Sequence, residues 1–486
     1  MKAFVAVDLG ATSGRVMLFN NDSALVELVE IHRFSNYLIK EGSYLYWDIK
    51  MILKEIKKGL RMALKKHDNI VSIGIDTFGV DFGILDKNNN LVQNPLSYRN
   101  NLGVVSKEIV NKKIDQEELY FKTGIQYMPF NTLYQLVYLN DVLKIKYDKV
   151  LLLPDLIAYY LTGNMATEKT NFSTTNLMNA NTYDVIDEVE KLNIGQDVFP
   201  KFIENGNSYG YLKEEVMKEL VTTKKIKVIA VCSHDTASAI LSIPKKQSQV
   251  FISSGTWSLL GTCLTKPNTS KIAEKYNFSN ELGYDNNVRF LKNIMGLWII
   301  NEVIKVFKKD NSKIDYHYIY EKMVEVRPFV SFIDVDDIRF MAPNNMVEEI
   351  KNYCQETNQK IPTTIGEITM TVYQSLVFKY KTNIEKLEKI TQRTFNKIYL
   401  VGGGGNIEIL NQMISSATNT KVIIGHTEAT VIGNLIIQLK ASGVIKTINE
   451  GIDLFEKGDN KIYEPNQVED YEEAYGRYLK ILAKIK

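Results

Sequence analysis

Asp235 is the residue whose position most directly suggests chemistry. It lies in VCSHDTASAI, residues 231–240, between a strand-like run and a helix-like run. A carboxylate where a helix begins is commonly an N-cap, stabilised by free backbone N–H groups and the helix dipole. The small side chains that follow would also leave it accessible, so it could accept a proton from a substrate hydroxyl during phosphoryl transfer. From these residues alone, a cap and a general base are both open.

A glycine-containing turn near the N-terminus has groups that could hold phosphate. In DLGATSGR, residues 8–15, Gly10 and Gly14 allow a tight turn and a close approach of the backbone to a ligand. Thr12 and Ser13 supply hydroxyl donors, and successive backbone N–H groups in such a turn form a concave surface for anions. The turn does not end as a P-loop does, and a plain hairpin is the alternative interpretation.

Two further stretches resemble parts of a nucleotide site. The turn Ser253-Ser254-Gly255-Thr256 repeats the small, hydroxyl-bearing composition, and two such turns could grip a polyphosphate. Asp8, on the first turn, is the carboxylate expected to approach a magnesium ion there, directly or through water. GGGGN, residues 402–406, suits a flat or bulky group lying against backbone, although a loose loop would have the same composition.

Alternating strands and helices would position these residues, which indicates an α/β architecture. The stretch 250–262 repeats the strand–turn–strand pattern of the N-terminus and predicts two related halves, with the polar residues 243–249 as linker. The expected strands are 3–8, 14–20, 71–76, 82–86 and 227–233, the expected amphipathic helices are 49–65 and 467–485, and strand-then-helix units are expected in 150–163, 397–418 and 421–439.

Composition limits the classes of partner. The 486 residues are 45% hydrophobic with a formal net charge of +2, which gives no electrostatic reason to expect a nucleic-acid or membrane partner. The three cysteines are far apart and fit a reducing compartment. Asp8 interrupts the first apolar run, and no run of about 20 apolar residues follows. We therefore expect a cytoplasmic protein.

The combination of DLGATSGR, SHDTAS, SSGTWSLLG and VGGGGN resembles the FGGY-type carbohydrate kinases, from about Phe4 to beyond Asn434. The resemblance implies an actin/hexokinase-like (ribonuclease H-like) α/β fold with a cleft between two domains. The first, residues 1–244, would hold the sugar site, the base and the first phosphate turn, and the second, residues 245–486, the nucleotide site.

Several other stretches, among them SIGIDTFGVDF at 72–82, resemble the branch of the family that acts on L-rhamnulose. The implied reaction is phosphorylation of O1 by ATP with Mg²⁺, giving L-rhamnulose 1-phosphate and ADP. A related ketose, L-fuculose or L-xylulose, is the alternative within the family. A non-kinase on the same fold, either an actin-like ATPase or a sugar sensor, is the alternative outside it.

The resemblance also implies individual roles. Asp235 would be the base that activates the primary hydroxyl of the ketose, and Gly403 would face the adenosine. The residues implied to contact ATP are Ala11, Thr12, Ser13, Gly14, Arg15, Thr256, Asn301 and Gly403, and those implied to line the ketose site are Gly79, His234, Asp235, Thr236 and Asn293. The expected partners are thus a small ketose and ATP, with no nucleic acid and no membrane, and the chain would be a monomer or a small homo-oligomer.

Three residues depart from the family pattern: Phe78 where Trp is usual, Asn100 where Asp is expected, and Asn301 where Gln is expected. Two further acids flank Gly79. We interpret Asp76 as a candidate ligand of sugar or metal and Asp81 as structural.

Overall fold

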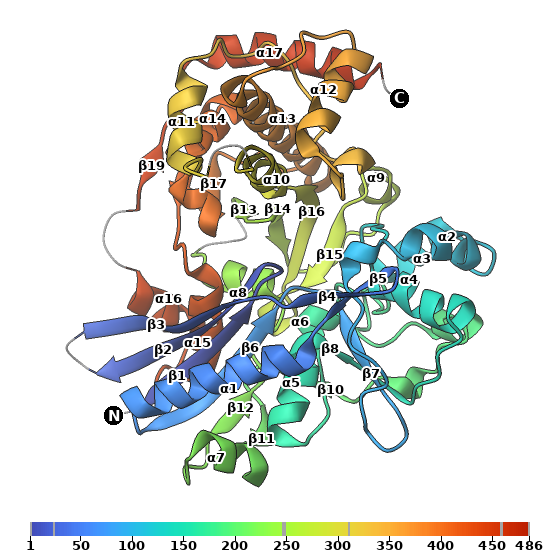
Figure 1. Cartoon of the computed structure of the whole chain (residues 1–486), viewed down its shortest axis with the longest axis vertical. Helices are drawn as coiled ribbons and strands as arrows, with labels where there is room; N and C mark the ends of the chain where they lie inside the picture. Colours follow the sequence, from blue (N-terminus) through green and yellow to red (C-terminus); the bar gives the residue numbers. More distant parts are fainter. Residues whose placement is uncertain (1, 23–24, 245–248, 310–311, 457–459, 485–486) are drawn as a thin grey trace. The chain divides into compact units, whose positions relative to one another are not determined.

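The structure, a computed structural model, describes residues 2–22, 25–244, 249–309, 312–456 and 460–484 (Figure 1). The chain forms two compact units. The first consists of Met1–Pro244, Cys263–Phe290 and Glu428–Lys457, and the second of Lys245–Thr262, Leu291–Thr427 and Gly458–Lys486. The boundary expected after residue 244 coincides with a border between these units, but two later stretches group with the first unit. The expected linker includes residues 245–248, which lie outside the described residues.

The first unit contains a six-stranded sheet in the order β11-β12-β6-β1-β2-β3. The strand β1 (Ala3–Leu9) pairs with β2 (Ser13–Asp22) as an antiparallel hairpin, and on its other side it pairs in parallel with β6 (Ile70–Thr77). Next to β6 lies β12 (Lys227–Ile229), also parallel. Three parallel strands therefore point their carboxyl ends toward the same edge of the sheet. The outer strands are β3 (Leu25–Ser35) and β11 (Ser208–Tyr211).

All seven residues of β1 are buried, because helices cover both faces of this sheet. Val5 and Val7 belong to a core cluster that includes the apolar stripe of α1 (Ile49–Lys66). Phe4 and Ala6 point to the opposite face, in a cluster with residues of α8 (Asp235–Leu241) and α15 (Ala429–Ala441). This alternation is the period of a strand buried on both sides. The predicted α/β class is confirmed.

The second unit repeats the opening topology of the first. Its hairpin consists of β13 (Val250–Ser254) and β14 (Trp257–Leu264), and β13 pairs in parallel with β17 (Lys397–Val401). The next parallel strand is β18 (Lys421–Ile424). Because each half opens with an antiparallel hairpin whose first strand continues into parallel pairing, the predicted relation between the two halves is confirmed.

Most predicted elements form close to their expected ranges. The strand predicted over 227–233 is shorter: β12 ends at Ile229, and the N–H of the next residue, Ala230, donates to Asn207 O at 2.8 Å. The remaining elements are β4 (Leu38–Glu41), β5 (Tyr44–Trp47), β7 (Phe82–Leu85), α2 (Gly103–Asn111), α3 (Gln116–Thr123), α4 (Thr132–Val137), β8 (Lys149–Leu152), α5 (Leu153–Thr162), β9 (Thr167–Glu168), α6 (Lys169–Phe172), β10 (Phe202–Ile203), α7 (Glu214–Leu220), α9 (Lys271–Lys275), β15 (Ser279–Leu282), β16 (Val288–Met295), α10 (Trp298–Phe307), α11 (Tyr316–Val324), α12 (Met346–Glu356), α13 (Ile365–Thr391), α14 (Glu408–Thr418), α16 (Ile448–Phe455), β19 (Ile462–Tyr463) and α17 (Val468–Leu482).

Within the described ranges, every helix is too short or too polar to cross a membrane.

Candidate functional site

Carboxylates gather at the carboxyl ends of the parallel strands in the first unit. Asp8, near the end of β1, is the register partner of Asp76 on β6. Past the end of β12, His234 forms a parallel bridge with Thr77, which brings Asp235 to the same edge. In open α/β sheets ligands bind outside the carboxyl ends of the strands. The topology thus brings together Asp8 and Asp235, which the sequence selected for different roles.

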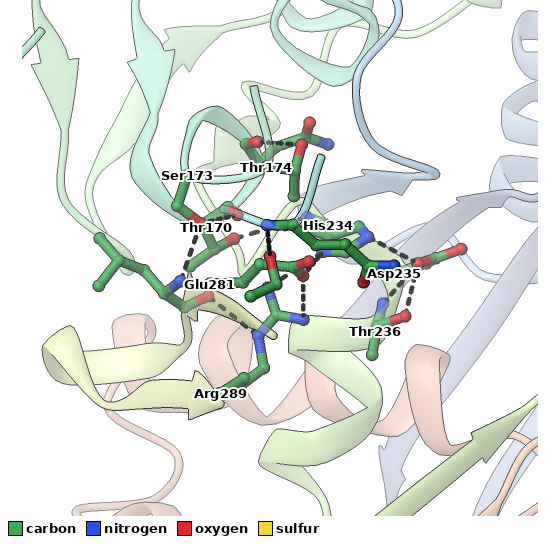
Figure 2. Close-up of polar contacts among 12 residues, drawn as sticks. Thr170, Ser173, Thr174, His234, Asp235, Thr236, Glu281 and Arg289 are labelled. Carbon is green, nitrogen blue, oxygen red and sulfur yellow. Dashed lines mark hydrogen bonds and ion pairs between the residues drawn. The ribbon is translucent and has the colours of Figure 1, made fainter. Parts of the chain in front are cut away.

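Asp235 is the first residue of α8, and His234 holds the cap position. Oδ1 of Asp235 accepts hydrogen bonds from its neighbour Thr236, from the backbone N at 2.5 Å and from Oγ1 at 3.1 Å (Figure 2). An N-cap would instead accept from an N–H two or three residues onward. The side chain keeps 31% exposure, so the carboxylate can be reached. The interpretation of Asp235 as a simple cap is therefore wrong.

The pKa of Asp235 is suited to proton transfer near neutral pH. Desolvation by the surrounding protein and the negative charge of Asp8 raise this pKa to about 7. A general base is most effective when its pKa lies close to the working pH. The site therefore has a reachable carboxylate that can take up a proton.

Glu168, at the end of β9, anchors the loop that delivers His234 and Asp235. It is fully buried, and its Oε2 accepts from Ser233 N at 3.1 Å and Ser233 Oγ at 2.6 Å. The same carboxylate accepts from Thr170 and Asn171 at the start of α6 and from Asn205. Sequence reasoning missed Glu168, because nothing in MATEKTN distinguishes a buried glutamate from a solvated one.

His234 has a charged neighbour, Arg289, that sequence reasoning also missed. Arg289 Nη2 lies 3.0 Å from Nδ1 of the ring, and Nε2 lies 3.4 Å from Asp235 Oδ1 (Figure 2). Burial and the positive charge of Arg289 hold the pKa of His234 well below its usual value. The ring is therefore neutral.

The first turn is a tight hairpin tip with Gly10 N donating to Ser13 O at 2.9 Å. Ala11 is half-buried and Thr12 is exposed at the tip. Gly14 has a packing reason, because a Cβ there would lie 2.3 Å from the ring of Phe34. The turn has the exposure that a phosphate contact needs, while Gly14 itself serves packing within the sheet.

Arg15 links the turn to two carboxylates. It pairs with Asp8 Oδ2 and with Glu428 Oε2, both at 2.5 Å, and its side chain is 16% exposed. Burial opposes its charge, but Asp8 and Glu428 raise the pKa of Arg15 above its usual value. Glu428 immediately precedes α15 and had no signal in the sequence.

Asp76 and Asp81 have structural partners. Asp76 is fully buried and its Oδ2 accepts from Asn434 Nδ2 at 2.6 Å, so it fixes α15 to the sheet, and its role as a ligand of sugar or metal stays a prediction. Burial and the nearby Asp8 raise the pKa of Asp76 well above its usual value. Asp81 accepts from Trp47 Nε1 at 2.6 Å and Tyr98 N at 2.9 Å, as expected for a structural residue.

The departures at Phe78 and Asn100 have local explanations. The ring of Phe78 packs 5.1 Å from Trp47, centroid to centroid. Asn100 accepts from Leu45 N and donates to Leu45 O, both at 2.8 Å. An aspartate could accept from Leu45 but could not donate, so Asn100 serves to hold β5.

The hydroxyl of Thr174 borders Gly79. A Cβ at Gly79 would lie 2.8 Å from Thr174 Oγ1. Thr236, directly after Asp235 in the chain, is buried. The absence of a side chain at Gly79 is therefore enforced by contact with Thr174.

In the second unit, the glycine run separates into different roles. Added Cβ atoms at Gly402 and Gly404 would lie 2.8 and 2.0 Å from atoms of Ser254, whereas Gly403 is exposed and would meet nothing within 4 Å. Packing explains the two neighbours, and Gly403 is the one whose surface is free to approach a ligand.

A pocket of about 310 Å³ in the second unit begins directly after this run. Its lining residues are Tyr316, His317, Ile319, Tyr320, Met323, Tyr373, Asn406, Ile407, Glu408 and Ile409. Its size and aromatic lining are typical of a site for a flat organic group. Asn301, on α10, accepts a hydrogen bond from Tyr316 Oη and thereby contacts this lining.

Thr256 and Asn293 also belong to the second unit. The carbonyl of Thr256 accepts from Gly296 N and Trp298 N, both at 3.2 Å, which fixes the turn between β13 and β14 to the start of α10. Asn293, on β16, is half-buried.

The carboxylate of Asp8 offers oxygen atoms, which are the ligands that Mg²⁺ prefers. Among the described residues no group of three or more His, Cys, Asp or Glu could enclose a metal. Mg²⁺ is usually held by one or two carboxylates together with substrate phosphates and water. The single carboxylate of Asp8 beside a candidate phosphate turn fits that pattern.

Two family models match successive stretches of the chain. Residues 3–242 match the N-terminal domain, and residues 250–442 the C-terminal domain, of the FGGY family of carbohydrate kinases. The chain belongs to the FGGY family of carbohydrate kinases and is a sugar kinase.

Within that class it is similar to curated rhamnulokinases. It is 39% identical to that of Ligilactobacillus salivarius over 100% of this chain and 98% of the relative, and 42% identical to that of Oceanobacillus iheyensis over 90% and 93%. Solved structures share the fold: gluconate kinase from Lactobacillus acidophilus has a TM-score of 0.82 at 16% identity, and ligand-bound xylulose kinase from the same organism 0.81 at 17%, each covering 100% of this chain and 98% of the other.

Proposed function

We propose that this chain transfers the γ-phosphoryl group of ATP to O1 of L-rhamnulose, giving L-rhamnulose 1-phosphate and ADP. The observation that carries the proposal is Asp235: a reachable carboxylate with a pKa near 7, placed at the carboxyl ends of the parallel strands. The rhamnulokinase name of the relatives supports the choice of sugar. We further propose a cytoplasmic enzyme, which the small number and wide spacing of the three cysteines, all of them buried, support.

In this proposal Asp235 accepts the proton of the ketose hydroxyl while the hydroxyl oxygen attacks the γ-phosphorus. The residues proposed to orient the ketose are Gly79, His234, Thr236 and Asn293. Because the transition state of phosphoryl transfer is loose, the base needs only to be ionised and correctly placed.

The nucleotide would be held by the residues already named for ATP. In the proposal, residues 11–15 and Thr256 are the groups that contact its phosphates. Gly403 lies against the adenosine, and the pocket contacted by Asn301 accepts the adenine ring. Asp8 holds Mg²⁺, which when bound neutralises charge on the phosphates. The oligomeric state stays a prediction.

The test is coupled ADP release with L-rhamnulose, L-fuculose and L-xylulose. We expect the highest kcat/KM for L-rhamnulose, and a loss of about 10²–10⁴-fold in kcat for Asp235→Asn with ATP binding retained. Higher kcat/KM for another ketose would reassign the substrate. ADP release that needs no ketose and survives Asp235→Asn would favour the actin-like ATPase instead.

A further inference from the structure

The ring of His234 lies beside two groups of opposite charge at different distances. Arg289 Nη2 is 3.0 Å from Nδ1, whereas Glu281 Oε2 is 3.6 Å from the same atom. Only the first distance is a hydrogen bond. A guanidinium has donors and no acceptor, so Nδ1 must be the acceptor. The proton of the neutral ring is therefore on Nε2, the atom 3.4 Å from Asp235 Oδ1.

Arg289 is itself held in place. Its side chain is 1% exposed, its Nη1 pairs with Glu281 Oε2 at 3.2 Å, and its Nε donates to Leu282 O at 3.0 Å. Both partners lie on β15, next in the chain to β16, which carries Arg289. Figure 2 shows Glu281, Arg289, His234 and Asp235 as one connected series.

We propose that Arg289, oriented by Glu281, is a positioning residue that fixes the Nε2–H tautomer of His234 and keeps a neutral donor beside Asp235. The role assigned to that donor, a hydrogen bond to an oxygen of the ketose, rests on the proposed function. The opposite tautomer would place N–H against N–H, and protonation of the ring would add a buried positive charge next to the guanidinium. The charged or titratable groups at the ring are Asp235 from α8, Glu281 from β15 and Arg289 from β16.

The direct test is the imidazole ¹⁵N spectrum of the free protein, which needs no substrate. The chain has five histidines, so His234→Gln identifies the signal by its loss. We expect Nε2 protonated and Nδ1 unprotonated over about pH 6–8. In Arg289→Met the ring should become a mixture of tautomers or titrate in that range, whereas Arg289→Lys should keep one donor at Nδ1. A proton on Nδ1 in the natural chain, or no change in Arg289→Met, would overturn the proposal.

Kinetics separate positioning from general stability. Arg289→Met should raise the KM for the ketose by about tenfold, the equivalent of one lost hydrogen bond, with the KM for ATP unchanged. Combined with His234→Gln, it should add less than about twofold, because its effect acts through that ring.

Ser173→Ala is the matched control. Ser173 Oγ accepts from Leu282 N at 2.8 Å, and Leu282 is the residue of β15 whose carbonyl accepts from Arg289. Among the described residues, no contact joins Ser173 to the imidazole. It should leave the ring signals and the ketose KM unchanged. If Arg289→Met raises the KM for the ketose equally in the natural chain and in His234→Gln, Arg289 has a structural role only. Arg289→Lys keeps the test valid if Arg289→Met fails to fold. If no ketose is phosphorylated but the tautomer is as expected, the proposed function fails and the positioning of His234 stands.

Discussion

Asp81 and Asp235 both have a pKa raised to about 7, yet their surroundings give them different uses. For Asp81 burial raises the pKa, and hydrogen bonds from Trp47, Gln135 and Tyr98 oppose the rise. Those donors occupy its oxygens and it is 1% exposed. Among the described residues, Asp235 accepts hydrogen bonds from Thr236 alone, and its side chain is 31% exposed. Access, and not the pKa alone, makes Asp235 the candidate base.

The first prediction concerns the pH dependence of catalysis. The base must be ionised, so kcat/KM for the ketose should fall as pH drops below about 7, approaching tenfold per pH unit, and level off above it. The desolvation and the charge of Asp8 that raise the pKa of Asp235 set this midpoint. Steady-state rates with saturating ATP measure it. A profile that stays flat down to pH values near the usual aspartate pKa of 3.8 would contradict the assignment.

The second prediction concerns stability. The folded-state pKa of Asp235 lies above its unfolded value, so ionisation of this carboxyl lowers the free energy of unfolding. This loss is absent below about pH 4, where the carboxyl is protonated in both states, and is complete above about pH 7. At a pH above 7, Asp235→Asn should therefore raise the Tm by a few degrees, which corresponds to a gain of about 1–2 kcal/mol in the free energy of unfolding once partial solvent screening is allowed for. Near pH 4 the substitution should leave the Tm unchanged. Thermal unfolding at both pH values measures the difference. An equal gain at both would trace the effect to something other than charge.

At the scale of elements, the loop between β12 and α8 depends on one buried acid. Glu168 connects the end of β9 and the start of α6 to Ser233, directly before His234. Glu168→Ala would leave several buried donors without an acceptor. We expect a loss of about 3 kcal/mol or more and a fall in kcat/KM larger than the fall in stability alone explains, because the base loses its support.

Glu204→Ala is the control for that third prediction. Glu204 is 62% exposed and pairs with Lys169, the first residue of α6, so its removal should change the Tm by little. Chemical unfolding and initial rates compare the two variants. Comparable losses from both would show that the buried position of Glu168 has no special effect.

The elements themselves were largely predictable because local patterns determine them. Ile52, Ile56 and Leu60 recur at helical spacing, and all three are buried on α1. The polar anchors were not predictable, since Glu168, Arg289 and Glu428 act through contacts far away in the chain. Their residue types are those of ordinary surface positions, and only the fold reveals that they are enclosed.

At the scale of the molecule, the first unit is completed by residues from near the C-terminus. Val431 and Leu435 of α15 cover Phe4 and Ala6, and Gly433 lies so close to Ser238 that an added Cβ would be 1.8 Å from its carbonyl oxygen. Gln438 also donates to Val5 O at 3.0 Å. From the sequence we predicted two contiguous halves, because the apolar residues of a helix show that it is buried but do not show which distant sheet it packs against.

The fourth prediction follows from that arrangement. A chain ending at residue 427 should lose protection of the β1 amides against hydrogen exchange and bind hydrophobic dyes, since one face of the sheet is uncovered. A chain ending at residue 457 keeps α15 and α16 and is the control, with β1 protection retained. Equal protection of β1 in both would mean that the first unit does not need its late segment.

The order in which a ribosome makes this chain has a consequence for Phe4 and Phe19. Their covering helix, α15, begins at Ala429, so most of the polypeptide must be synthesised before this face can close. At about 5–20 residues per second, the interval lasts tens of seconds. Nascent chains should accordingly rely on chaperones throughout translation, and a pause late in the message should cost more soluble protein than one early on.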